Sequence, residues 1–157
     1  MSDRGLRDGI EDLFAAYAEC IDDNRLEEWP DFFVEACRYR ITNRADHEAG
    51  LPHGVIYAAS RAMLQDRVRA LRVANIFEPH RYRHILGRVR LGRVENGVAE
   101  ARSSFLVVRI MHDGAAALFA TGRTLDSIAV NGAPFRFLER LVVLDSPKID
   151  TLVVIPL

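Results

Sequence analysis

The chain has 157 residues and a formal net charge of −1, so it has the length of one domain, which we expect to span residues 1–157. Acidic and basic side chains nearly balance and no block of like charge stands out, which excludes a general nucleic-acid binder. All of the 21 basic residues except Lys148 are arginine. Beyond a coding bias, this enrichment is typical of subunit contacts, because a planar guanidinium tolerates partial burial.

The cysteines and the hydropathy of the chain indicate a cytoplasmic protein. Cys20 and Cys37 are the two cysteines, and they form no CxxC or zinc pattern, so we expect two buried thiols in a reducing compartment. The first residues lead into an amphipathic helix rather than an apolar signal core. No run of about 18 apolar residues occurs, so no membrane-spanning helix is expected.

The first predicted element is a helix over Leu6–Asp23, which Asn24 can end. Its apolar residues recur at the spacing of one buried helical face. They are Ile10, Leu13, Phe14, Tyr17, Ala18 and Ile21. A short second helix is expected around Leu26–Phe32, and Trp29 and the phenylalanines after it should close one end of the core. Tyr17 and Trp29 could instead line a ligand pocket.

Alternating apolar and polar residues predict a strand over Ala36–Asp46. The segment Asp46–Gly50 offers carboxylate and imidazole groups that could bind a divalent ion, but nothing nearby completes such a site, and we interpret it as a solvated loop. Helical spacing returns over Ala58–Asn75. Arg67 borders the apolar stripe of this helix, so it needs an acceptor and is a candidate for an internal or intersubunit ion pair.

Beyond Pro79 the chain is expected to form four long strands joined by tight turns. The strands are Arg81–Glu95, Val98–Asp113, Ala115–Val130 and Phe135–Ser146, and the turns contain Asn96-Gly97, Asp113-Gly114 and Asn131-Gly132. Asn-Gly and Asp-Gly supply the positive φ values of hairpin turns, so consecutive strands should pair in an antiparallel meander. This element order predicts an α+β fold in which a strongly curved antiparallel sheet wraps the N-terminal helices into a cone.

The strand around Phe105–Met111 is largely apolar on both faces. One face can meet the helices. The other must meet a second sheet, a curved wall of the same sheet or another chain.

Two histidines in Glu78–Gly87 give the strongest candidate for chemistry. His80 and His84 are four residues apart, a spacing that suits zinc on a helix, but Pro79 and the alternation that follows indicate a strand. Residues four apart on a strand are separated by about 13 Å, at ~3.3 Å per residue, so we expect no shared metal.

His84 shares a strand face with Tyr82, which leaves two interpretations open. His84 could be a general base in a cone-shaped pocket, with Arg109, Asp126 or Glu139 from other strands. It could also be a hydrogen-bonded histidine in a polar network at the edge of the core or of an interface, which we favour. No GxSxG, glycine-rich phosphate loop, dinucleotide fingerprint or HExxH occurs, and neither cysteine belongs to the paired Cys and His pattern of a Rieske centre.

The chain also resembles a known family along nearly its whole length. The matching residues lie in the aromatic, strand, helix and histidine segments described above and in the last residues. They are Trp29-Pro30, Phe32-Phe33, Cys37–Asn43, His47, Gly50-Leu51, Met63-Leu64, Asp66-Arg67, Leu71-Arg72, Ala74–Ile76, His80–Gly87, Arg109–His112, Glu139-Arg140 and Pro156-Leu157. They resemble the small (β) subunit of aromatic-ring-hydroxylating dioxygenases, the oxygenases with a Rieske cluster and non-haem iron. Within this family the likeness is greatest to the branch that acts on terephthalate and similar aryl carboxylates.

This resemblance implies a cone of the ketosteroid isomerase and nuclear transport factor (cystatin-like) type. It also implies an assembly of three large (α) and three small subunits, in which the Rieske cluster and the mononuclear iron belong to the large subunit. No catalytic, cofactor-binding or metal-binding residue of the family is expected on this chain.

Two hypotheses therefore follow from the sequence. The first, which we favour, is a non-catalytic oxygenase subunit in which Arg67, Arg81, Arg83 and His84 are interface or supporting residues. The second is a free-standing enzyme of the same cone fold, an isomerase, dehydratase or hydrolase, or a small-ligand binding protein. The second requires a deep polar cavity.

Overall fold

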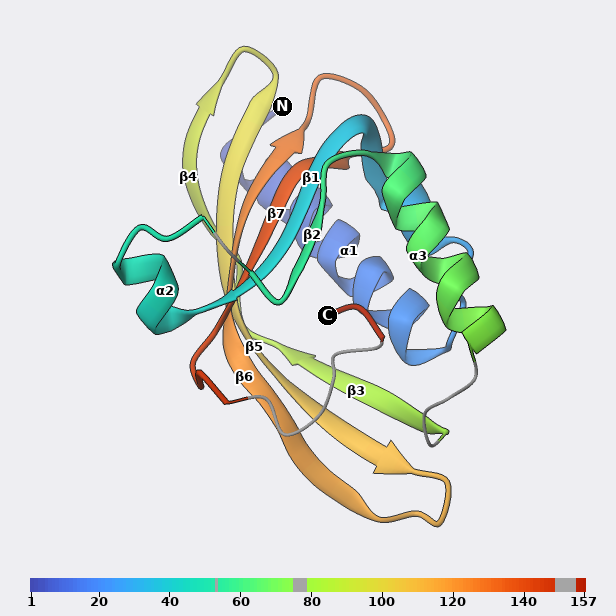
Figure 1. Cartoon of the computed structure of the whole chain (residues 1–157). Helices are drawn as coiled ribbons and strands as arrows, with labels where there is room; N and C mark the ends of the chain where they lie inside the picture. Colours follow the sequence, from blue (N-terminus) through green and yellow to red (C-terminus); the bar gives the residue numbers. More distant parts are fainter. Residues whose placement is uncertain (53, 75–78, 149–154) are drawn as a thin grey trace.

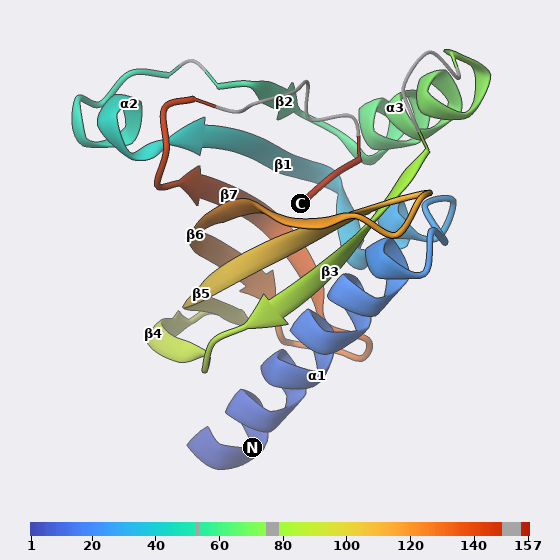
Figure 2. The same ribbon diagram turned by 90° about the horizontal axis from the view of Figure 1, so that it is seen from below.

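The computed structural model describes residues 1–52, 54–74, 79–148 and 155–157. The helices are α1 (Asp3–Asp22), the 3-10 helix η1 (Trp29–Phe32), α2 (Arg44–Glu48) and α3 (Arg61–Ala74). The strands are β1 (Phe33–Asn43), β2 (Ile56–Ala58), β3 (His80–Leu86), β4 (Arg90–Glu95), β5 (Val98–Met111), β6 (Ala116–Ala129) and β7 (Arg136–Leu144). In Figure 1 and Figure 2, α1 lies in the hollow of a strongly curved sheet, and α3 packs beside β1 and η1.

The strands form one 7-stranded sheet in the order β2-β1-β7-β6-β5-β3, with β4 also paired to β5. The predicted α+β cone is confirmed, and so is the antiparallel meander from β4 to β7. The sheet is mixed rather than wholly antiparallel, because β1 and β7 run parallel. Two neighbouring parallel strands must be joined by a long crossover connection. Here the connection from β1 to β7 includes all the elements from α2 to β6.

Helix α1 forms where the apolar spacing predicts it. The Ser2 hydroxyl accepts a hydrogen bond from the Gly5 N–H group (3.2 Å) and so caps the first turn. Asn24 follows the helix with a φ of +60°, in the left-handed region where Asn is favoured among non-glycine residues. The buried residues of α1 include the predicted apolar stripe and, in the last turn, Asp22. The helix therefore carries a carboxylate into the core.

The segment between β1 and α3 differs from the prediction in four places. One of them is that the first residues of the loop expected at Asp46–Gly50 belong to the helix α2. The strand expected to reach Asp46 ends at Asn43, because the Asn43 side chain accepts the Asp46 N–H (2.9 Å) and caps the short helix α2. The strand β2 was not predicted. The next helix begins at Arg61 instead of Ala58, and its expected end at Asn75 lies outside the described residues.

The strand predicted over Arg81–Glu95 is interrupted and forms β3 and β4. Both pair with the same edge of β5, with Leu86 opposite Phe105 and Arg90 opposite Arg102. Between these two residue pairs the β3–β4 side therefore has one more residue than β5. One extra residue on one side of a strand pair is the pattern of a β-bulge. Such a bulge bends the strand and so contributes to the curvature of the cone.

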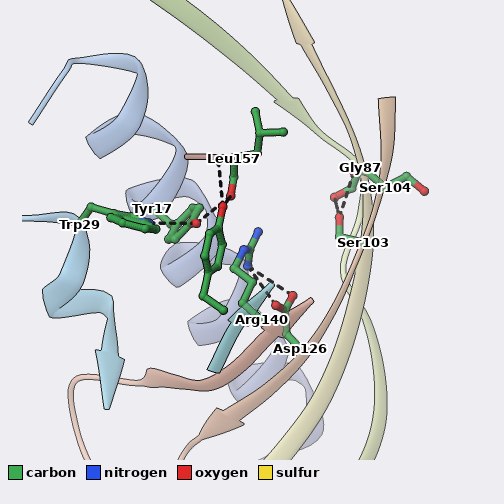
Figure 3. A network of polar contacts seen from close by, with 9 residues as sticks. Tyr17, Trp29, Gly87, Ser103, Ser104, Asp126, Arg140 and Leu157 are labelled. Carbon is green, nitrogen blue, oxygen red and sulfur yellow. Dashed lines mark hydrogen bonds and ion pairs between the residues drawn. The ribbon is translucent and has the colours of Figure 1, made fainter. Parts of the chain in front are cut away.

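Aromatic side chains close one end of the core, as predicted. The indole of Trp29 donates to the Tyr17 hydroxyl (3.0 Å), and the hydroxyls of Tyr17 and Tyr39 both donate to the Leu157 carbonyl (2.8 and 2.9 Å; Figure 3). Trp29, Tyr17 and Tyr39 are fully or almost fully buried, and burial raises the pKa of Tyr17 to about 12. Each buried polar tip thus has a partner, so the end of the chain is held inside the cone.

A buried ion pair joins β6 and β7 at the centre of the sheet. Arg140 lies opposite Asp126 and donates to both of its carboxylate oxygens at 3.3 Å (Figure 3). The guanidinium also stacks over the rings of Phe14, Tyr17 and Phe137, at 4.9, 4.3 and 4.6 Å from their centroids. Burial raises the pKa of Asp126 to about 6, and the charge of Arg140 opposes the increase.

The close approach of β6 to β7 gives a first prediction. A Cβ atom at Gly122 would collide with the Val143 carbonyl, so Gly122→Ala should lower the free energy of unfolding by about 3 kcal/mol, the upper part of the range for overpacking. Gly132 has open space around it and lies in the β6–β7 loop, so Gly132→Ala should change it by less than about 0.5 kcal/mol. Urea denaturation of both variants measures the difference, and equal effects would contradict the close packing.

The pKa of Asp126 gives a second prediction. This carboxyl binds a proton more tightly in the folded chain than an unperturbed aspartate does, so its contribution to stability is greatest below about pH 4 and is lost as the pH rises to about 6. Over this pH range the contribution of Asp126 to the free energy of unfolding falls by up to about 3 kcal/mol. Asp126→Asn has no carboxyl to titrate at this position. The difference in the free energy of unfolding between the variant and the wild-type chain should therefore change between pH 4 and 6. A difference that stays constant over this range would show that Asp126 does not titrate there.

Candidate functional site

Three of the four residues singled out from the sequence lie on β3, an edge strand of the sheet. Its alternation is as predicted, because Tyr82 and His84 face the interior with ring centroids 6.2 Å apart. Arg81 and Arg83 are exposed on the other face. The strand geometry keeps His80 and His84 from forming a local metal site. Among the described residues, no group of three or more His, Cys, Asp and Glu side chains could hold a metal ion.

His84 forms a buried pair with Asp22, the last residue of α1. The His84 Nδ1 atom is 2.6 Å from Asp22 Oδ1, and the His84 backbone N–H donates to Asp22 Oδ2 (2.9 Å). The two side chains are 4 % and 3 % exposed. Because the N–H of an edge strand has no partner strand, the carboxylate satisfies it and fixes the end of α1 against the sheet. Arg83 adds a longer contact, 3.9 Å from Asp22 Oδ2.

Asp22 was not among the partners that the sequence suggested for His84. Arg109 stacks over Phe119 (5.1 Å) and Asp126 pairs with Arg140, whereas Glu139 is exposed. One signal could have identified Asp22, because it follows Ala18 by four residues and so falls on the apolar stripe of the helix. A carboxylate on a buried stripe requires a partner.

The pair has the arrangement of a general base with its orienting carboxylate, but the space beside it is small. The cavity that His84 shares with Tyr17, Phe105, Thr124 and Arg140 has a volume of about 10 Å³. Pockets for organic ligands are usually some 300–1,000 Å³. The larger hollows, of about 490 to 530 Å³, are open grooves on the surface. The cavity beside His84, as the described residues form it, is therefore not the deep polar cavity that a free-standing enzyme would need.

The fourth residue, Arg67, lies on α3, half-buried as its position beside the apolar stripe suggests. Its charge acts on Tyr39, because it lowers the pKa of that hydroxyl against the larger raising effect of burial. Arg67 is thus placed near the closed end of the core, apart from the three residues of β3.

The outer face of the sheet presents apolar side chains where β3, β5 and β6 run side by side. Cross-strand pairing places Ile85 opposite Leu106 and both Arg83 and Leu118 opposite Val108. Directly opposed residues share one face of a sheet, so these five residues form a continuous surface, which we call the outer patch. Ile85 is 53 % exposed and Leu118 is 66 % exposed. The prediction that this part of β5 is apolar on both faces is thereby confirmed.

No helix in the described part of the chain is long and apolar enough to span a membrane. Cys20 and Cys37 are free and buried, as expected.

Comparisons with known proteins agree on one family. The family model described as "Ring hydroxylating beta subunit" matches residues 16–151. The chain is 46 % identical to the beta 1 subunit of the terminal oxygenase component of terephthalate 1,2-dioxygenase from Comamonas sp, over 91 % of this chain and 93 % of that one. It is 31 % identical to the small subunit of anthranilate 1,2-dioxygenase from Burkholderia cepacia, over 90 % and 88 % of the two chains.

A crystal structure gives the same result. It is assigned as the beta subunit of an aromatic-ring-hydroxylating dioxygenase from Novosphingobium aromaticivorans DSM 12444, and it superposes with a TM-score of 0.90 and 36 % identity over 98 % of both chains. The chain therefore belongs to the family of aromatic-ring-hydroxylating dioxygenase beta subunits.

Proposed function

We propose that this chain is the non-catalytic structural subunit of an oxygenase that hydroxylates or dihydroxylates an aryl carboxylate in aromatic catabolism. The observation that carries this proposal is the identity of 46 % with a terephthalate 1,2-dioxygenase subunit across nearly the whole chain. The small interior cavity agrees with it, because a substrate of this size has no room inside the cone. Residues 1–157 act as one beta-subunit domain in this proposal.

The proposal places the redox groups on a partner. The Rieske iron–sulfur cluster and the mononuclear iron belong to a large alpha subunit, since the sequence context of Cys20 and Cys37 lacks the paired Cys and His ligands of such a cluster. The complex works in the cytoplasm, where reduced nicotinamide is available. The substrate pocket is also on the large subunit, so this chain affects the reaction through assembly.

The proposed assembly contains three large and three small subunits, and the outer patch is one of its contact surfaces. An exposed apolar surface flanked by arginine is typical of subunit interfaces.

The distribution of charge along the chain also supports contacts between copies of the chain. Acidic side chains outnumber basic ones over residues 1–35, and basic ones outnumber acidic ones over residues 36–157. The acidic helical layer of one copy can therefore face the arginine-rich sheet of the next.

The role of the outer patch gives a third prediction. Leu118→Glu places a charge on β6, at the most exposed apolar side chain of the patch, and should prevent or strongly weaken assembly, because the carboxylate loses its hydration on docking. Val73 on α3 is 84 % exposed and lies outside the patch, so Val73→Glu is the matched control and should assemble normally. Size-exclusion chromatography with light scattering on the chain co-expressed with its large subunit distinguishes the two. Normal assembly of Leu118→Glu would exclude the patch as an interface.

Arg83 gives a fourth prediction, which separates assembly from chemistry. Arg83→Ala should raise the dissociation constant of the complex by about 5- to 30-fold, because a partly buried interface arginine is worth on the order of 1–2 kcal/mol. Arg93→Ala is the control, since Arg93 is also an exposed strand arginine with a carboxylate 3.9 Å away, in Glu95.

Turnover per assembled complex should be unchanged in both variants. Loss of turnover in a fully assembled Arg83→Ala complex would contradict a purely structural role. If the wild-type chain and its large subunit elute separately and the large subunit hydroxylates normally alone, the proposed function itself fails.

A further inference from the structure

Three residues with buried polar side-chain atoms line the small cavity inside the cone. His84 Nε2 and Arg140 Nε are each shielded from solvent and have no hydrogen-bond partner among the described residues. Thr124 Oγ1 is equally shielded, and its hydroxyl lies close enough to Asp126 to lower the pKa of that carboxyl, which leaves its oxygen able to accept a further hydrogen bond. All three residues line the same cavity, although they come from β3, β6 and β7. The His84 side chain is 4 % exposed, and Thr124 and Arg140 are 3 % and 4 % exposed. Each such atom costs about 1–3 kcal/mol if it is left without a partner.

The hydrogen-bonding state of each atom follows from its neighbours. Asp22 Oδ1 lies 2.6 Å from His84 Nδ1, and a carboxylate only accepts, so Nδ1 carries a proton. In the neutral tautomer with this proton, the Nε2 atom is an acceptor. The Nε–H group of Arg140 is a donor, while its Nη1 is already engaged by Asp126. The Thr124 hydroxyl can donate or accept. The cavity therefore requires a ligand that both donates and accepts.

The volume of the cavity selects the ligand. A volume of about 10 Å³ is the minimum space for a single water molecule. We propose that the cavity is the binding site of one buried water molecule, which donates to His84 Nε2, accepts from Arg140 Nε and exchanges a hydrogen bond with the Thr124 hydroxyl. Three hydrogen bonds are the usual number for an internal water. This site does not depend on the proposed assembly.

The water molecule joins two buried pairs that would otherwise be separate. On one side Asp22 and His84 connect α1 to β3, and on the other Asp126 and Arg140 connect β6 to β7. Together with the water they form a polar chain across the cone, from its helix to the opposite wall. The polar interior is then a satisfied structural network rather than a substrate site.

High-resolution crystallography of the full chain, alone or in its complex, tests the site directly. We expect one fully occupied peak within hydrogen-bond distance of the three atoms, with no other group there. A bromide soak distinguishes an anion, because bromide at this position would give an anomalous signal. The absence of a peak or the presence of an anion would overturn the proposal.

A pair of variants on β6 tests the partners. Thr124→Val keeps the shape of the side chain and removes its hydroxyl, so the peak should weaken or disappear. The Nε2 resonance of His84 in histidine ring ¹⁵N spectra should then move downfield, as expected for a ring nitrogen that loses a hydrogen bond. Thr121→Val makes the same change three residues away, where the hydroxyl donates to Asp145 (2.9 Å), and should leave both signals unchanged. An unchanged peak and resonance in Thr124→Val would contradict the three-partner site.

Discussion

The structure depends on how one carboxylate, Asp22, is satisfied inside the cone. Helix α1 ends at Asp22, where the negative end of the helix dipole disfavours a carboxylate, and the side chain is also buried. Two hydrogen bonds from His84 offset both costs, one from the imidazole and one from the backbone N–H of the edge strand. The contact covers the edge of β3, which would otherwise be open to pairing with another chain. It also fixes the helix along the hollow of the sheet, around which the remaining core packs.

This arrangement leaves the outside of the cone for the subunit contacts that we propose. In the cone fold the interior is the natural place for a ligand, and here Asp22 and His84 have the geometry of an acid–base pair. The aromatic residues around Tyr17 and the docked Leu157 fill that space, and Arg140 covers three rings at its base. With about 10 Å³ left, the polar groups stabilise the fold, and the large exposed features remain on the outer face of the sheet.

The sequence predicts the parts of this fold that depend on local patterns. Helical spacing located α1, and Asn96-Gly97 and Asp113-Gly114 located two hairpin turns, with φ values of +52° at Asn96, +75° at Gly97 and +90° at Gly114. The third predicted tight turn, at Asn131-Gly132, is wrong, because neither residue has a positive φ and both lie in the longer loop between β6 and β7. The bulge after Leu86 and the parallel β1–β7 pair could not be read in this way, because both arise from pairing between distant segments. The same is true of the Asp22–His84 pair, whose members are 62 residues apart. The strand alternation correctly placed His84 inside, but only the tertiary structure identifies which carboxylate it meets.

The two faces of β3 have different surroundings. The His84 side chain bonds to Asp22 and the Tyr82 ring is buried, so the contacts of these two residues lie within the cone. Arg81, Arg83 and Ile85 alternate with them and remain exposed. Because one strand serves both faces, the interior pair sets the position of the outer side chains: a shift of β3 relative to α1 moves the outer patch as well. The buried carboxylate thus helps to fix the geometry of the outer patch, the surface that we propose as a subunit contact.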